Sequence, residues 1–198
     1  TTRFGTQSVL ASRIALRKAG IDPDRDITMV QTGGPAETIS AMVAGKVHAA
    51  AISPPATMQA RRVKLRDLMD LSNLDVEYHV NGVVTTRPYL KTNEDTVRRF
   101  LRAYIEGAVR GMKDKAFAIK AMGKYFRTED RDLLEETYEM SIKNGFSVPP
   151  HPAGIASLLQ DLEKTQPKAK GAKPEDFIDG RLVRELDQSG FIKSVLSR

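Results

Sequence analysis

The sequence predicts an α/β fold class, in which helices cover a mainly parallel sheet. The first observation behind this prediction is that helical and strand patterns alternate through the first 65 residues. The second is that each predicted helix in this region opens with a short loop rich in glycine, proline and hydroxyl side chains. A chain of 198 residues that is 40% hydrophobic and 28% charged also has the composition of a folded globular protein.

The first 65 residues contain three predicted helices and two predicted strands. Residues 6–19 show amphipathic helical spacing and stop at Gly20. "ITMVQ" (27–31) has the β-branched composition of a strand, and residues 36–45 predict a second helix with Pro35 at its start. "VHAAAIS" (47–53) is small and apolar enough for a buried parallel strand. A third helix is expected to begin at the prolines after this strand.

The remainder of the chain is predicted to be mainly helical. Residues 65–90 contain two further strand-like runs. A long amphipathic helix is expected over 93–114, capped by Thr92 or Asn93. Further helical patterns lie at 116–126, 130–145, 150–166 and 181–191. The apolar stripes of these helices need a partner surface.

Composition excludes several classes of site. The chain has no cysteine, so disulfides and thiol catalysis are excluded. His48, His79 and His151 are far apart and lack metal-ligand spacing, so neither a metal site nor a cofactor is expected. The net charge is +6, but basic and acidic residues are mixed along the chain, which disfavours a nucleic-acid surface. No apolar run has the length that spans a bilayer.

Three strand-to-helix loops carry the predicted small-molecule site: 3–8, 31–37 and 52–56. In a parallel α/β sheet such loops share the carboxyl edge, where ligands bind, and free N–H groups at helix N-termini favour anions there. Hydroxyl groups in the loops can donate further hydrogen bonds; they belong to Thr6, Ser8, Thr32 and Ser53. The alternative interpretation is that the loops are ordinary helix caps. No catalytic motif accompanies them, so the protein is not expected to be an enzyme.

The three loops and several later segments resemble a known family. The stretch from "RFGTQS" through "AGKVHAAAISPP" resembles the second lobe of periplasmic solute-binding proteins of ABC importers. The nitrate/sulfonate/taurine-type and thiamine-pyrimidine-precursor-type class is the most similar. Residues 81–107 are similar to the return strand and long helix of that class, and residues 164–192 to its carboxy-terminal signature.

This resemblance implies a type II periplasmic-binding-protein-like fold with two lobes. Residues 1–80 would form lobe 2 and residues 81–198 the carboxy-terminal part of lobe 1, with the amino-terminal part of lobe 1 absent from this chain. The second crossing between lobes would lie at residues 78–84, and the lobes would close by a hinge motion. Matched position by position, the ligand-binding residues implied are Gly5, Thr6, Gln7, Ser8, Gly33, Gly34, Pro35, Ser53, Pro54 and Asn81. One departure is His48, which stands where family members often have Asp.

The function implied is capture of a small organic or anionic molecule, of the sulfonate, nitrate, pyrimidine or aromatic acid class. A signal peptide would direct the protein to the periplasm. There it would act as a monomer when complete and deliver its ligand to an ABC permease in the membrane. Two alternatives share the architecture: a cytoplasmic enzyme of the pyrimidine-synthesis type and a ligand-sensing regulatory domain. A signal peptide upstream would favour transport, whereas a helix-turn-helix segment there would favour regulation.

Overall fold

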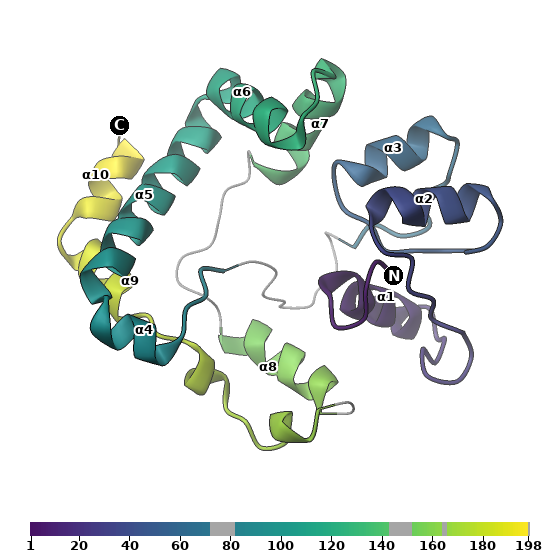
Figure 1. Cartoon of the computed structure of the whole chain (residues 1–198), viewed down its shortest axis with the longest axis horizontal. Coiled ribbons are helices and arrows are strands. Elements are labelled where there is room, and N and C mark those ends of the chain that lie inside the picture. The colour runs from purple at the N-terminus through teal and green to yellow at the C-terminus, as the bar shows by residue number, and fades with distance from the viewer. Residues whose placement is uncertain (72–81, 143–151, 164–165, 198) are drawn as a thin grey trace. The chain divides into compact units, whose positions relative to one another are not determined.

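A computed structural model describes residues 1–71, 82–142, 152–163 and 166–197. The chain divides into two compact units, Thr1–Asp75 and Val76–Arg198, which are drawn together in Figure 1. The assignment of residues 1–80 and 81–198 to lobes of a binding protein stays a prediction.

The first unit contains three helices: α1 (Gln7–Lys18), α2 (Pro35–Val43) and α3 (Ala56–Arg62). All three lie where the hydrophobic spacing and the glycine and proline signals predict them. Gly20 and Gly45, just beyond α1 and α2, have φ angles of 76° and 67°. Only glycine adopts this left-handed conformation readily, so these residues end the helices as predicted. The three helix predictions in this unit are confirmed.

A small apolar core joins α2 to α3. Ile39 of α2 packs with Ala56 and Ala60 of α3, and these three side chains are at most 8% exposed. Ile52 and Leu65 cover the edge of this cluster. The loop at 52–56 is therefore held against α2 by apolar contacts.

The predicted α/β, type II binding-protein-like fold is wrong for this structure. The described residues contain no strand and no sheet. The segments 27–31 and 47–53, predicted as strands, are neither helical nor part of a backbone ladder, and His48 and Ala49 in the second segment are exposed. A strand needs hydrogen bonds from a neighbouring strand, whereas a helix pairs its own backbone groups. The strand-like runs in 65–90 are likewise not strands where they are described; residues 72–81 lie outside the described part.

The second unit is built from helices and two short 3₁₀ turns. These are α4 (Arg87–Thr92), α5 (Glu94–Lys113), α6 (Lys115–Phe126), α7 (Arg131–Ser141), α8 (Pro152–Leu162), η1 (Pro167–Ala169), η2 (Pro174–Phe177), α9 (Arg181–Gln188) and α10 (Phe191–Ser197). The predicted helices at 93–114, 116–126, 130–145, 150–166 and 181–191 are confirmed, with shorter bounds in the later ones. Neither α4 nor α10 was expected from the sequence pattern.

Two clusters form the core of this unit. In the first, α5 packs against α9 and α10, which lie along it in Figure 1. Its buried side chains are Ile105, Val109, Leu186, Phe191 and Val195. In the second, α6 packs against α7 through Ala118, Met122, Leu134 and Tyr138. Together the clusters bury the inward-facing part of the predicted apolar stripes of these helices.

One edge of the α5 stripe does not join either cluster. Phe100 is 55% exposed and Tyr104 is 43% exposed, and their rings stack on each other with centroids 6.4 Å apart. The predicted stripe is thus divided: Ile105 and Val109 are buried, whereas the aromatic pair faces outward.

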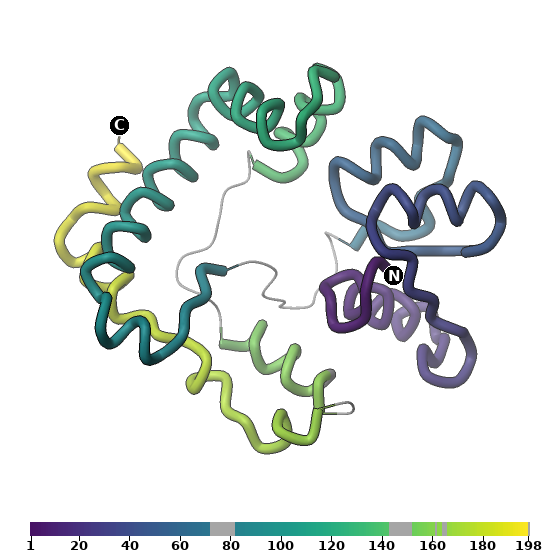
Figure 2. Tube along the Cα trace, viewed as in Figure 1, coloured from purple at the N-terminus to yellow at the C-terminus, as the bar shows by residue number. Residues whose placement is uncertain are grey.

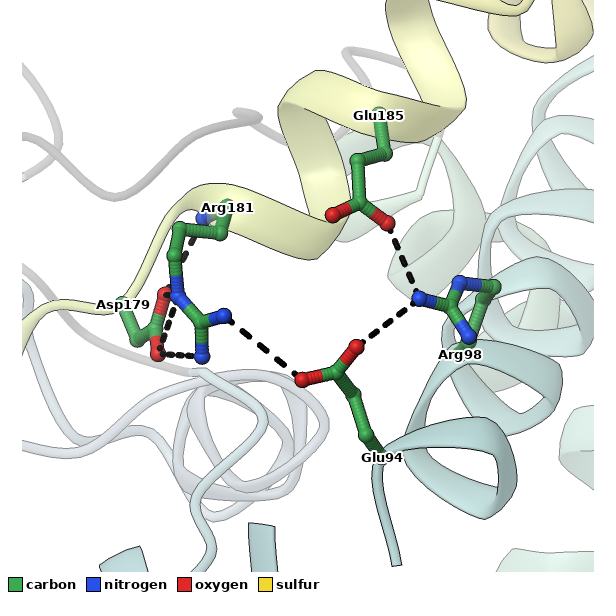
Figure 3. A network of polar contacts seen from close by, with 5 residues as sticks. All are labelled: Glu94, Arg98, Asp179, Arg181 and Glu185. Atoms are coloured by element: carbon green, nitrogen blue, oxygen red, sulfur yellow. Dashed lines mark hydrogen bonds and ion pairs between the residues drawn. The ribbon is translucent and has the colours of Figure 1, made fainter. Parts of the chain in front are cut away.

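A network of ion pairs fastens the carboxy-terminal segment to the start of α5. After α8 the chain passes through η1 and η2 and returns beside α4, as Figure 2 shows. There the Arg87 guanidinium donates a hydrogen bond to the Asp176 carbonyl. In Figure 3, Arg98 contacts both Glu94 and Glu185 at 3.0 Å, and Arg181 contacts Glu94 at 3.5 Å. Ion pairs between residues of opposite charge therefore join the first turns of α5 to α9.

Candidate functional site

The first two predicted loops are brought together by backbone hydrogen bonds. The Thr1 nitrogen donates to the Val30 carbonyl at 3.0 Å, and the Thr32 N–H donates to the Thr1 carbonyl at 2.9 Å. The Gly33 N–H then donates to the Thr2 carbonyl at 2.8 Å. In the first two bonds Thr1 pairs with Val30 and Thr32, the residues on either side of Gln31. This is the hydrogen-bond pattern of two parallel segments. The two segments therefore lie side by side and run in the same direction before they enter α1 and α2.

Four hydroxyl side chains gather in the first loop and the two residues before it, and we refer to them as the hydroxyl cluster: Thr1, Thr2, Thr6 and Ser8. The Ser8 oxygen lies at the centre, 2.7 Å from the Thr1 hydroxyl, 3.1 Å from that of Thr2 and 3.0 Å from that of Thr6. The Thr6 hydroxyl donates to the Arg3 carbonyl at 2.7 Å. Every hydroxyl of the cluster therefore has a possible acceptor within residues 1–8.

The second loop repeats this arrangement on a smaller scale. The Thr32 hydroxyl lies 2.8 Å from the Thr1 carbonyl and 2.6 Å from the Thr38 hydroxyl, and the latter donates to the Gly34 carbonyl at 2.8 Å. Thr38 is only 1% exposed, so these bonds satisfy a buried polar group. The sequence reasoning did not identify Thr38, because an isolated threonine inside a helical pattern carries no signal of its own.

The N-terminus of α1 is open, whereas that of α2 is screened. Thr6 and Gly34 are the N-cap residues, and neither makes a side-chain cap bond. The first turn of α1 has no acidic residue, and the backbone N–H groups of Gln7 and Ser8 have no partner among the described residues. At α2, by contrast, a Cβ added to Gly34 would lie 2.5 Å from a carboxylate oxygen of Glu37. An anion is therefore favoured at α1 and disfavoured at α2.

The other predicted site residues are placed as follows. Gly5 and Gly33 have φ angles of 77° and 108°, a conformation that glycine permits at these turns, and Gln7 and Pro35 are exposed beside them. Ser53 is exposed, its hydroxyl has no hydrogen bond to a described residue, and Pro54 is half-buried. The third loop thus makes no hydrogen bond to the other two in the part of the chain that is described. Asn81 lies outside the described residues.

Sequence reasoning missed one contact between the loops. The backbone N–H of Phe4 donates a 2.9 Å hydrogen bond to the side-chain oxygen of Gln31. Both residues stand in the predicted loops, yet neither is a glycine, a hydroxyl residue or a charged group, the residue types that signal a binding loop in a sequence. Their proximity follows from the parallel pairing of Thr1 with Gln31, which a sequence pattern does not specify.

The described residues offer no metal centre, since no group of three or more acidic or histidine side chains among them could hold an ion. In the same part of the chain, no helix combines the length and the apolar character that crossing a membrane requires.

Comparison with known proteins gives one match. A family model described as NMT1/THI5 like matches residues 5–116, which is more than half of the chain and includes residues 5–8 of the first loop and the whole of the second. No curated protein matches the chain, and no solved structure matches it. The family match agrees, at this coarse level, with the resemblance to solute-binding proteins and is consistent with binding and transport of a small solute. On the extent of this match, the chain belongs to the NMT1/THI5-like family.

Proposed function

We propose that the protein is a solute-binding protein that captures a small organic or anionic molecule and delivers it, from the periplasm, to the permease of an ABC importer. On this proposal the protein catalyses no reaction. Its ligand belongs to the sulfonate, nitrate, pyrimidine or aromatic acid class. The observation that carries the proposal is the family match, which starts at Gly5 within the first loop and covers the whole of the second.

The geometry at α1 supports an anionic or polar group on the ligand. The free N–H groups of Gln7 and Ser8 point out of an uncapped helix end whose first turn contains no acid. The positive end of a helix dipole stabilises an anion most strongly within this first turn. Gly5, with its left-handed backbone, leaves the approach to these groups free of a side chain.

Isothermal titration of the full chain against nitrate, alkyl and aryl sulfonates, pyrimidines and aromatic acids tests the proposal. At least one compound is expected to bind with a one-to-one stoichiometry. Folded protein that binds no compound of this panel would contradict the proposal. Uptake of the binding compound by cells with and without the gene then tests delivery.

A charge variant tests the location of the anion. Gln7→Glu is nearly isosteric at an exposed position and places a carboxylate in the first turn of α1. Because that charge competes with an anionic ligand, the dissociation constant should rise about tenfold or more, while the helix itself is stabilised slightly. The matched control is Gln59→Glu, which adds the same charge at an exposed position of α3 and should leave the affinity within about twofold.

A further inference from the structure

A surface pocket of about 620 Å³ lies where α6 ends and α7 begins, the two helices that pack side by side in Figure 1. A pocket of this size has room for a small organic group or a lipid head group. It belongs to the second unit, and its lining residues lie beyond residue 116, where the family match ends. Neither the proposed solute site nor the family match therefore accounts for this pocket.

The pocket is apolar where the two helices meet. Leu134 of α7 is 4% exposed, and Ile119 of α6 packs against the same cluster. Gly123 lets the turn after α6 approach closely, because a Cβ there would lie 3.1 Å from the Thr128 carbonyl oxygen and 3.3 Å from a methyl carbon of Leu134. A group that enters the pocket therefore meets apolar surface on one side.

Three cations at the pocket have no carboxylate partner among the described residues. They are Lys120, Lys124 and Arg127, and all three side chains are exposed. Glu129 also lines the pocket, but it forms no ion pair with any of them. Three cations and one carboxylate leave the pocket with a net charge of +2.

The other cations of α6 and α7 are paired. Lys115 contacts Glu139 at 3.0 Å and Glu135 at 3.6 Å, and Arg131 contacts Glu135 at 2.9 Å. The carboxylates that neutralise cations elsewhere on these helices thus have no counterpart at the pocket. Its positive charge is therefore available to an anionic partner.

Arg127 has a backbone conformation that favours glycine. It directly follows α6 with φ 54° and ψ 48°, in the left-handed region where a side chain is strained. Lys64 follows α3 with φ 62°, so this conformation does not by itself mark a site. Arg127 differs because it lines a pocket beside two further unpaired cations, and a strained residue in such a place indicates a function.

Two exposed aromatic side chains stand beside these cations at the end of α6. Tyr125 is 78% exposed and Phe126 is 45% exposed, and the Lys124 ammonium lies 5.8 Å from the centre of the Tyr125 ring. Exposed aromatic rings next to lysine and arginine are typical of surfaces that contact the interface of a bilayer. A soluble anion would use the pocket alone, so the rings favour a membrane as the partner.

We propose that this pocket and the two aromatic rings form a docking surface for a membrane that contains anionic phospholipids. A lipid phosphate binds among Lys120, Lys124 and Arg127, since arginine and lysine form charge-assisted hydrogen bonds with phosphate oxygens. The rings of Tyr125 and Phe126 enter the interface beside it. The inference goes beyond the proposed solute-binding function and does not depend on it, because no residue of the first unit takes part.

Co-sedimentation of the full chain with lipid vesicles tests the proposal. Vesicles of phosphatidylcholine alone are compared with vesicles that also contain phosphatidylglycerol. The chain should bind the anionic vesicles about tenfold or more tightly, and added salt should weaken this binding. Equal binding to the two kinds of vesicle would overturn the proposal.

Arg127→Gly separates binding from folding, because it removes a cation and also relieves the strained backbone. The variant should bind anionic vesicles about fivefold more weakly, yet unfold at the same or a higher urea concentration than the wild type. Lys64→Gly is the matched control, since it removes one cation from the same conformation after α3. It should leave vesicle binding within about twofold. Equal losses in the two variants would show that only the net charge of the chain attracts the membrane, and the proposal would fail.

Tryptophan fluorescence locates the contact. The chain contains no tryptophan, so Tyr125→Trp introduces a single reporter. Its emission should shift to shorter wavelength when anionic vesicles are added, whereas that of Tyr89→Trp, at a tyrosine of α4 that is 47% exposed, should not. An unshifted Tyr125→Trp would contradict the proposal. Binding of hexyl phosphate that Arg127→Gly abolishes, without vesicle binding, would assign the pocket to a soluble phosphate ester instead and would also overturn it.

Discussion

The hydroxyl group of Tyr138 donates a 2.7 Å hydrogen bond to the backbone carbonyl of Met112. Tyr138 belongs to α7 and is 5% exposed, and Met112 lies in the last turn of α5. Carbonyl groups in the last turn of a helix receive no hydrogen bond from within that helix, so they need partners from elsewhere. This bond therefore completes the end of α5 and fixes α7 beside it.

Replacing this hydroxyl should destabilise the second unit. Tyr138→Phe keeps the ring that packs against α6 but leaves the Met112 carbonyl without its partner. The free energy of unfolding should fall by about 1 kcal/mol, measured by urea denaturation. Tyr125→Phe, at a tyrosine that is 78% exposed, is the control and should change it by less than about 0.5 kcal/mol. Equal losses in the two variants would contradict the assigned role.

Truncating a side chain in the core shared by α5, α9 and α10 should lower the free energy of unfolding further than the loss of the Tyr138 hydroxyl. Ile105 is 2% exposed, and Ile105→Ala removes three carbon atoms from the middle of this cluster. The free energy of unfolding should fall by about 2–5 kcal/mol, because the transfer term and the cavity add. Thermal or urea unfolding measures the change.

The control lies on the same helix. Phe100→Ala removes a larger side chain, but one that is 55% exposed. The free energy of unfolding should therefore fall by less than about 1.5 kcal/mol, including the lost stacking of Phe100 on the Tyr104 ring. A cost for Phe100→Ala equal to that for Ile105→Ala would show that the outward face of α5 is covered in solution.

The helices could be predicted from the sequence because their signals are local. The start and stop residues of α1 and α2, such as Pro35, Gly20 and Gly45, act within one turn of the chain. The helix α4 is only six residues long, too short for a periodic pattern, and α10 follows α9 across the short turn at Gly190. Neither helix therefore gives a distinct pattern in the sequence.

The strand predictions were wrong because a strand forms only where a neighbouring strand supplies its backbone hydrogen bonds. "ITMVQ" has strand-like composition, yet its only backbone pairing with another described segment is the short contact between Thr1–Thr2 and Val30–Gly33. The alternation of helix and strand patterns therefore predicted where loops and helices lie, but not the sheet.

The same limit applies to the site. The loops at 3–8 and 31–37 were identified from their composition, and the structure joins them. The partners of Thr6 and Ser8 could not be predicted, since those hydroxyls bind within their own loop instead of remaining free. The contact between Phe4 and Gln31 depends on the register of two segments that are 27 residues apart in the chain.

The ion network at α9 should make stability depend on acid pH. Arg181 donates hydrogen bonds to both carboxylate oxygens of Asp179, which hold the pKa of that carboxyl below its ordinary value of 3.8. A group whose pKa is lower in the folded state adds stability above its unfolded pKa. This stability is lost as the pH falls from about 4 through the folded pKa.

Urea midpoints at pH 6 and pH 3 measure this effect. Asp179→Asn removes the titrating group, so the midpoint should fall less between the two pH values than in the wild type. Arg181→Gln removes the cause of the lowered pKa and should flatten the profile in the same direction. Both side chains are partly exposed, so the change is small and shrinks in high salt. A wild-type slope in both variants would argue against the interaction.

The hydroxyl cluster should stabilise the first unit, with Ser8 as its central member. The Ser8 oxygen lies within hydrogen-bonding distance of the hydroxyls of Thr1, Thr2 and Thr6 and accepts from the Thr2 N–H at 3.3 Å. Ser8→Ala removes all of these bonds at once and leaves half-buried groups without partners. The free energy of unfolding should fall by about 1–2 kcal/mol, and exchange of the Thr2 amide hydrogen should become faster. Ser40→Ala, at an exposed serine of α2, should change the stability by less than about 0.5 kcal/mol. If Ser8→Ala were equally neutral, the cluster would not hold the loop, and its hydroxyls would be available to a ligand after all.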